Sequence, residues 1–373
     1  MCPVCTGVKP MSHEKLTRFG YALVNQEKAR VIIEPNQRAS GYWFGGGNMS
    51  QHEDLLYLVG RYRNAGDSRK GLGLGERGLE LAVFRSEDAG YTFDKVISLS
   101  KNDLAGMDEE GRAVKSIEGS TLSFTPDGVE LYVSSEKALS YPDDIVEYQK
   151  PDTGIWTIEY CKARDVESIS ECTLKTVLRS SDPRWLHLKD PTIHKLANGG
   201  TVLGFVTHPF SWSSSNTAYC SINERRELNE PVFNFLQRGF TWDVAVSRAT
   251  AWLNVPRVGK FADGPKTLIF YDGAESMRDL DEHKEALKRP RGYSCEELGG
   301  LAVSDASGVG DIQRLSVKEP LFTSPMGTGC SRYVDILETR EGFYATWQQS
   351  QDDQSQPLVM NFLSREDAEK ILS

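Results

Sequence analysis

The chain carries one hydrophobic pattern five times: a short apolar run, a turn, and a run in which apolar and polar residues alternate until it ends in polar residues. The copies span residues 41–63, 118–137, 190–210, 248–273 and 332–350. Their turns recur at roughly 65 to 77 residues, which is long enough for one four-stranded sheet with its loops. Repetition of β-rich units at this scale predicts a five-bladed β-propeller.

The same alternation predicts the strands of each blade. We expect first-blade strands at 42–44, 55–63, 78–85 and 91–97, and later second strands at 129–134, 201–207, 266–271 and 343–347. Either residues 22–34 or residues 357–363 must complete the last sheet, because a closed ring avoids an exposed edge. The fold class is therefore all-β, with a single propeller domain of four-stranded antiparallel blades over residues 21–373. A flexible arm is expected at 1–20, and a short C-terminal helix capped by Ser364.

Composition agrees with one large β domain in which apolar side chains pack between blades. The net charge of −10 and pI near 5.3 argue against a general nucleic-acid or anionic-membrane binder, which needs a basic stripe. The N-terminus has no apolar core like that of a signal peptide, and no run approaches membrane-spanning length. Seven scattered cysteines, an odd number, indicate reduced thiols. We therefore expect a cytoplasmic protein.

Charged residues fall at matching places in several copies. Glu118, Asp190 and Arg332 each lie ten residues before the turn glycine of their own copy, and Arg248 begins the fourth copy. The first strand of each propeller blade lines the central channel, so equivalent strand ends meet at one mouth. We therefore expect two acids and two arginines to converge on one pocket.

Two carboxylates in one cleft are what glycoside cleavage needs, one as proton donor and one as base or nucleophile. Glu118 in an Ile-Glu-Gly-Ser phrase and Asp190 in a Lys-Asp-Pro phrase resemble the catalytic phrases of five-bladed propeller glycosidases, the arabinanases, xylosidases and invertases. That resemblance implies Glu118 as general acid and Asp190 as an acid-tuning, substrate-holding residue. Two departures stand against a direct transfer. The first copy offers aromatics and Asn48 where those families keep a general-base Asp, and here the Glu precedes the Asp.

Other carboxylates are candidates for the missing base. Glu296 and Glu297 lie in the long connection of the fourth blade, and Asp272 lies at the end of its second strand. A solvated or structural role is the alternative for these three. Glu118 and Asp190 have an alternative too, as residues that cap strand ends or pair with the arginines.

The arginines suggest an anion. Guanidinium groups of Arg248 and Arg332 at inner positions favour bidentate capture of a carboxylate, sulfate or phosphate, with Arg61 and Arg63 as candidates for a third arginine. Residues 86–93 match the S-x-D-x-G-x-T-[WF] Asp-box of sialidases, which use an arginine cluster; we interpret this turn itself as structural. The alternative is that the arginines balance buried Glu118 and Asp190.

Further substrate contacts are expected near the mouth. Trp43 and Tyr333 can stack on sugar rings, while Asn48 and His208 can hydrogen-bond hydroxyls; packing between blades and a structural histidine are the alternatives. A charged helical stretch at 275–288 fits a lid or a contact between copies of the chain. No cofactor is expected, and a structural calcium ion in the channel is compatible with the fold but has no support in the sequence.

These patterns predict a glycoside hydrolase acting on a small carbohydrate, an oligosaccharide or glycoside with an anionic or furanose sugar. Glu118 is the expected acid, Asp190 the base or acid-tuning partner, and Arg248 and Arg332 the anchors. One alternative is a sialidase-like or uronate-directed enzyme whose arginines face an open pocket. A second is a propeller that binds a sugar or a protein without catalysis, because propellers serve many functions.

Overall fold

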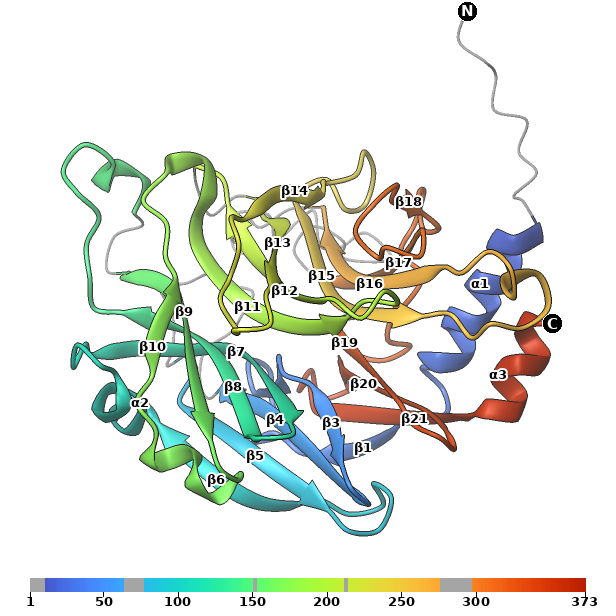
Figure 1. Cartoon of the computed structure of the whole chain (residues 1–373), viewed down its shortest axis with the longest axis horizontal. Helices are drawn as coiled ribbons and strands as arrows, with labels where there is room; N and C mark the ends of the chain where they lie inside the picture. The colour runs from blue at the N-terminus through green and yellow to red at the C-terminus, as the bar shows by residue number, and fades with distance from the viewer. Residues whose placement is uncertain (1–10, 64–76, 150–152, 211–213, 276–296) are drawn as a thin grey trace, which may run out of the picture.

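A computed structural model describes residues 11–63, 77–149, 153–210, 214–275 and 297–373 of the chain. Five antiparallel sheets surround a central axis in it, so the predicted five-bladed β-propeller is confirmed (Figure 1). Each sheet contacts the next in chain order, and the last packs against the first through β2 and β20.

The strands follow the predicted plan, with one inner strand per blade. The inner strands are β2 (Trp43–Gly45), β7 (Val114–Thr125), β11 (Leu186–Lys195), β15 (Val246–Asn254) and β19 (Ser331–Glu338). The second strands are β4 (Leu55–Arg63), β8 (Gly128–Lys137), β12 (Thr201–His208), β16 (Thr267–Ala274) and β20 (Gly342–Gln349). The outer strands are β5 (Glu80–Ser86), β6 (Asp94–Ser100), β9 (Ile155–Ala163), β10 (Lys175–Leu178), β13 (Asn216–Ile222), β14 (Val232–Leu236), β17 (Leu298–Ser304) and β18 (Gln313–Arg314). A short extra strand, β3 (Met49–His52), also pairs with β4.

Both ends of the chain complete the last blade. Its order is β19, β20, β21 (Leu358–Ser364) and β1 (Arg30–Ile33), with Val31 opposite Val359. The sequence offered residues 22–34 or 357–363 as alternatives, and the structure uses a strand from each. Closing the ring in this way pairs the N-terminal strand with the C-terminal part of the chain.

A helix replaces half of the predicted flexible arm. Residues Met11–Leu23 form α1, whose Leu16, Phe19 and Leu23 are buried against the last two blades. The apolar positions of α1 recur at helical spacing and cover one end of the blade core. The domain thus includes residues 11–20, and residues 1–10 lie outside the described part.

The C-terminal helix is confirmed. Residues Arg365–Leu372 form α3, and the Ser364 side chain accepts a hydrogen bond from the Asp367 amide as an N-cap. Helices α1 and α3 lie side by side on the outside of the ring (Figure 1). The third α-helix of the described ranges, α2 (Lys101–Met107), begins with a capping box of Ser100 and Asp103 and connects the first blade to the second. None of the helices in the described ranges is both long and apolar enough to cross a membrane.

The turn at residues 86–93 connects β5 to β6 and is held by its own side chains. Asp88 Oδ1 accepts from the Thr92 amide at 2.8 Å, and its Oδ2 accepts from the Thr92 hydroxyl at 2.7 Å. Gly90 takes a φ of +85°, and its amide donates to the Ser86 hydroxyl at 2.8 Å. These bonds lie on the outside of the blade and agree with the structural interpretation of the turn.

Candidate functional site

The N-terminal halves of the inner strands meet at one mouth of the ring, and three of these strands share the same kind of bulge there, in which two residues face one. Two residues of β7 (Glu118 and Gly119) face one residue of β8, and two residues of β11 (Asp190 and Pro191) face one of β12. In β19 the bulge falls between Arg332 and Asp335. Glu118, Asp190 and Tyr333 therefore hold equivalent places at the mouth.

Arg332 does not share that position, although counting ten residues back from the turn glycine had predicted that it would. The pairing of β19 with β20 places Arg332 opposite Gln348, one residue ahead of the bulge. The turns themselves are alike, since Thr339 bonds Gly342 as Thr125 bonds Gly128. The bulge of β7, however, lies one residue farther from its turn than the bulge of β19. A shift of one residue follows, so Tyr333 rather than Arg332 is the counterpart of the two acids.

The first blade supplies a cation at this level instead of a carboxylate. Gly46, just after β2, has a φ of +70°, and a Cβ built on it would lie 1.9 Å from Nη1 of Arg61. The missing side chain thus leaves the space that the Arg61 guanidinium fills from strand β4. Arg61 is 3% exposed and stacks on the Trp43 ring at 4.7 Å.

Arg61 holds both predicted catalytic carboxylates. Its Nη2 donates to Glu118 Oε2 at 3.3 Å and lies 3.8 Å from Asp190 Oδ1. These two oxygens are therefore no more than about 7 Å apart. Burial by itself raises the pKa of Glu118, but Arg61, Lys189 and Arg77, together with a hydrogen bond from Ser116, lower it to about 2.

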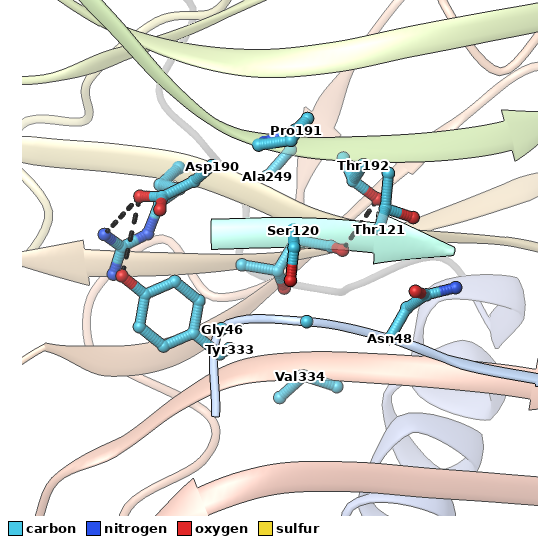
Figure 2. A pocket seen from close by; sticks show the side chains of 13 residues that line it. Gly46, Asn48, Ser120, Thr121, Asp190, Pro191, Thr192, Ala249, Tyr333 and Val334 are labelled. Carbon is cyan, nitrogen blue, oxygen red and sulfur yellow. Dashed lines mark hydrogen bonds and ion pairs between the residues drawn. The ribbon is translucent and has the colours of Figure 1, made fainter. Parts of the chain in front are cut away.

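Asp190 is tied to the other side of the mouth. Its Oδ1 accepts from the Gly119 amide at 3.0 Å, and its Oδ2 lies 3.3 Å from Nη1 of Arg248. The Tyr333 hydroxyl donates to the same Oδ2 at 3.5 Å and accepts from Arg61 Nη2 at 3.1 Å. Asp190 and Tyr333 point toward each other across the channel (Figure 2). Burial raises the pKa of Tyr333 to about 12, so its hydroxyl stays protonated at neutral pH.

Both residues adopt a backbone conformation that side chains rarely take. The φ angles are +53° for Asp190 and +54° for Tyr333, in the left-handed region. Such strain persists where the surrounding structure determines the position of a side chain, and it occurs often at functional sites. Beside the two residues lies a cavity of about 20 Å³, lined by residues of all the inner-strand regions and large enough for about one water molecule.

Arg248, predicted as a substrate anchor, is buried, and carboxylates take up its donors, which favours the alternative that it balances buried acids. Its Nε and Nη2 donate to Asp272 Oδ2 at 3.1 and 2.9 Å, and Nη2 donates to Glu297 Oε2 at 2.7 Å. With Asp190 it faces three carboxylates. Its guanidinium lies 4.2 Å from the centre of the Tyr333 ring.

Asp272 and Glu297, candidates for the missing base, hold this arginine in place. Asp272 is fully buried in β16 and also accepts the Tyr333 amide at 3.0 Å. Burial is the largest cause that raises the pKa of Asp272, to about 6, although Arg248 opposes it. Glu297 Oε2 joins Arg248 to Arg332, and these two arginines hold the pKa of Glu297 well below its usual range against the effect of burial. Glu296 lies outside the described residues.

Arg332 keeps part of its guanidinium unpaired. Its Nε donates to Gln348 Oε1 at 2.8 Å and its Nη1 to Glu297 Oε2 at 2.6 Å, whereas its buried Nη2 has no partner among the described residues. The guanidinium lies 5.2 Å from the Trp43 ring and 5.5 Å from the Tyr333 ring. Trp43 and Tyr333 are therefore both at the mouth, packed against arginines.

Two predicted contacts lie elsewhere or are used by the fold. The Asn48 amide makes paired bonds with the Leu122 backbone, at 2.7 Å to its N–H and 3.0 Å to its carbonyl, and so ties the first blade to the second. His208 is 1% exposed, and its Nδ1 lies 2.8 Å from the Ser214 carbonyl. Burial is the main cause that holds the pKa of His208 well below its usual range. These contacts favour structural roles for both side chains.

Sequence reasoning missed several charged or polar groups of the mouth. Arg77 donates from Nη2 to Glu136 Oε2 at 2.6 Å, and burial raises the pKa of Glu136 although Arg77 opposes it. Gln348, which is fully buried, also belongs to the site. The signal for Glu136 and Gln348 in the sequence is that each lies at the polar end of a second strand, as Arg61 does. Among the described residues, no group of three or more His, Cys, Asp or Glu side chains is placed to hold a metal ion.

Comparisons with known proteins agree on the fold. No family model matches the chain, and no curated protein matches its sequence. Among solved structures, a GH43_1 enzyme from Xanthomonas citri complexed with xylose aligns over 96% of this chain and 94% of its own, at 12% identity and a TM-score of 0.54. An α-L-arabinofuranosidase from Lactobacillus brevis aligns over 88% of this chain and 92% of its own, at 9% identity and a TM-score of 0.55. For a β-xylosidase the two shares are 91% and 95%, at 11% identity and a TM-score of 0.52. At these identities the likeness is one of fold.

Proposed function

We propose that the protein is a glycoside hydrolase whose catalytic carboxylates are Glu118 and Asp190. The single observation that carries the proposal is their placement around Arg61 Nη2, which brings Glu118 Oε2 and Asp190 Oδ1 to within about 7 Å at the mouth of the propeller. Glycosidases hold their two carboxyl groups about 5 to 10 Å apart across the scissile bond. The likeness in fold to proteins named as a xylosidase and an arabinofuranosidase adds support.

The environment of Glu118 favours a role different from the one expected from the sequence. A general acid must carry its proton at the working pH, whereas the pKa of Glu118 is lowered to about 2. Glu118 is therefore proposed as the ionised partner, a base or nucleophile. Asp190 is assigned to the leaving-group side by its position alone, with the protonated Tyr333 hydroxyl 3.5 Å from its Oδ2.

The two roles are separable by experiment. Glu118→Ala and Asp190→Ala are assayed on 4-nitrophenyl and on unactivated glycosides of xylose and arabinose, with and without sodium azide. Each variant should lose about 100-fold or more in kcat on the unactivated glycosides. A variant that lacks the general acid should still turn over 4-nitrophenyl glycosides, because their leaving group needs no proton. A variant that lacks the base or nucleophile should regain turnover when azide is added, because azide attacks the sugar in its place. Glu87→Gln, on an exposed turn, is the matched control.

The assignment is overturned if azide restores Asp190→Ala and not Glu118→Ala. The proposed function itself fails if a panel of neutral and acidic glycosides shows no turnover by the unaltered protein, or if both variants keep full activity.

A propeller that binds a sugar without cleaving it is the second candidate. The observation in its favour is that both carboxylates are paired with arginines, Glu118 with Arg61 and Asp190 with Arg248. Calorimetric binding of a sugar by a protein that turns over none of the panel would identify this function.

A further inference from the structure

Three side chains on one side of the mouth present buried donors that the described residues leave unpartnered. They are Nε and Nη2 of Arg63, Nη2 of Arg332 and Nε1 of Trp43. Buried polar groups in native proteins are almost always hydrogen-bonded, and leaving one unmade costs free energy. Every one of these atoms is a donor, so the partner that they lack is an acceptor.

The three residues form one patch, which we call the donor cluster. Trp43 is directly opposite Arg63 in the pairing of β2 with β4, so their side chains leave the same face of the sheet. The Arg332 guanidinium also approaches the Trp43 ring, at 5.2 Å. Trp43 itself is 4% exposed, so its indole N–H is removed from bulk water.

The charges around the donor cluster are not balanced. Arg61 has Glu118 as its partner, Arg77 has Glu136, and Arg248 has three carboxylates. Arg63 makes no ion pair within the described residues. Burial is the largest cause that lowers the pKa of Arg63, to about 10, and the nearby Arg332, Arg77 and Arg61 lower it further against the effect of Glu118. An anion among these arginines would offset their mutual repulsion.

The donor cluster also adjoins the proposed catalytic carboxylates. Arg63 and Arg61 lie two residues apart on β4, so both side chains leave the same face, and Arg61 bonds Glu118. A sugar ring placed at Glu118 would thus carry a substituent toward Arg63 within the span of one monosaccharide.

We propose that the donor cluster of Trp43, Arg63 and Arg332 is a subsite for a singly charged acidic group of the sugar, the carboxylate of a uronic acid or a sulfate ester. This inference rests on the proposed function, because it places the sugar at the same mouth. Guanidinium groups match planar and tetrahedral oxyanions with paired hydrogen bonds, and the indole N–H adds a fixed neutral donor. One arginine without a carboxylate partner suits a monoanion.

Calorimetry with free sugars tests the subsite without requiring turnover. The probes are D-galacturonate and D-glucuronate, the 6-sulfates of D-galactose and D-glucose, and the two neutral hexoses. We expect one acidic probe to bind about tenfold or more tightly than its neutral match, since hydrogen bonds to charged groups are the stronger kind. Added NaCl should weaken the binding of that acidic probe and leave the binding of the neutral sugar unchanged. Comparing the uronates with the 6-sulfates shows which oxyanion the site binds.

Variants then assign the preference to the cluster. Arg63→Met should abolish the difference between the acidic and neutral probes, Arg63→Lys should retain part of it, and Trp43→Phe should reduce it while keeping an aromatic ring. Arg85→Met, an arginine on the outside of the same blade, is the control and should keep the preference. Thermal melting of each variant shows that it is folded.

The inference is wrong if no acidic probe binds more tightly than its neutral match, or if Arg63→Met and Arg85→Met have the same effect. Its failure differs from that of the proposed function. If neutral glycosides are turned over and no acidic probe is preferred, the hydrolase proposal holds and the subsite proposal fails. If an acidic probe is preferred, Arg63→Met abolishes that preference, and no glycoside is turned over, the subsite proposal holds and the hydrolase proposal fails.

Discussion

Arg61 Nη2 donates to Glu118 Oε2 at 3.3 Å. The Arg61 side chain is 3% exposed and that of Glu118 13%, and this ion pair sets the charge state of the proposed site. The pair joins adjacent blades, since Arg61 belongs to β4 and Glu118 to β7. Because the carboxylate is buried, it depends on the arginines around it to remain ionised. Its loss should therefore be visible both in catalysis and in pH dependence.

Replacing Arg61 by Met should move the acid limb of the kcat/KM profile to higher pH. Without the guanidinium, burial raises the pKa of Glu118, so a larger fraction of the carboxylate is protonated below neutrality. We expect kcat/KM at pH 5 to fall more than at pH 8 when pH–rate profiles are measured for both proteins. Arg61→Lys, which keeps the charge, is the control and should move the limb less. An unchanged limb in Arg61→Met would contradict the proposed role of Glu118.

Replacing Glu297 by Gln should destabilise the fold by about 3 kcal/mol, because breaking a buried ion pair leaves an uncompensated charge. Glu297 Oε2 is shared by Arg248 and Arg332, at 2.7 and 2.6 Å. The folded protein lowers the pKa of Glu297, so the pair stabilises the fold above the unfolded pKa of about 4.3 and this contribution is lost as pH falls below it. Urea unfolding should show the difference at pH 7 and a smaller one at pH 3.5. Glu87→Gln should have no such effect.

Replacing Phe19 by Ala should destabilise the protein by about 3 to 5 kcal/mol, the usual cost of removing a buried aromatic ring. Phe19 is fully buried, and its ring lies 5.6 Å from that of Phe343 in an edge-to-face contact. The expected effect follows from the place of α1 in the core of the last two blades. Chemical denaturation measures it, with exposed Arg18→Ala as the control. Equal stability of the two variants would mean that α1 is dispensable.

Replacing Asp335 by Asn should make the protein more stable than the unaltered one, by an amount that grows as pH increases from about 4 to 8. Asp335 Oδ2 accepts the Met49 amide at 2.8 Å on the far side of the channel from the mouth, and burial raises the pKa of Asp335 to about 7 against two backbone hydrogen bonds. A carboxyl with a raised pKa binds its proton more tightly in the folded state, so ionising it between the unfolded and folded pKa values costs stability.

The Asn variant lacks that cost while keeping an acceptor for the Met49 amide. Its melting temperature, measured across this pH range, should gain about 2 °C or more on that of the unaltered protein. Asp127→Asn, on an exposed turn, is the control and should follow the unaltered protein. A constant difference across the whole pH range would show that Asp335 does not titrate in this window.

The blade plan could be read from the chain because alternation and turns are local. Strand β4 at Leu55–Arg63 matches its predicted range, and the second strands of the other blades match within a few residues. A phrase repeated five times leaves few architectures, and the closing strands follow from the need to pair both edges. The arm at residues 1–20 was the main error: Leu16, Phe19 and Leu23 recur at helical spacing, but a single short helix is stabilised only by its contacts with distant blades.

The site could be predicted only in part. The convergence of Glu118, Asp190, Arg248 and Arg332 follows from the repeat, but their partners do not. Arg61 fills space that Gly46 leaves empty one strand away, and Asp272 bonds the backbone of Tyr333 in the next blade. These pairings depend on neighbouring strands and blades, about which the spacing within one copy carries no information.

The sequence by itself determined the architecture and the mouth at which the charged residues gather, because period-two alternation and repeat length are properties of the chain alone. The tertiary structure decided which of those residues are equivalent and which are free to act. Bulges at unequal distances from the turns shift the register by one residue, so Tyr333 rather than Arg332 lies beside the acids. Side chains of its own blade and of the preceding one engage Arg248 with three carboxylates, whereas Arg63 has none among the described residues, and that difference arises only when the strands and blades pack together.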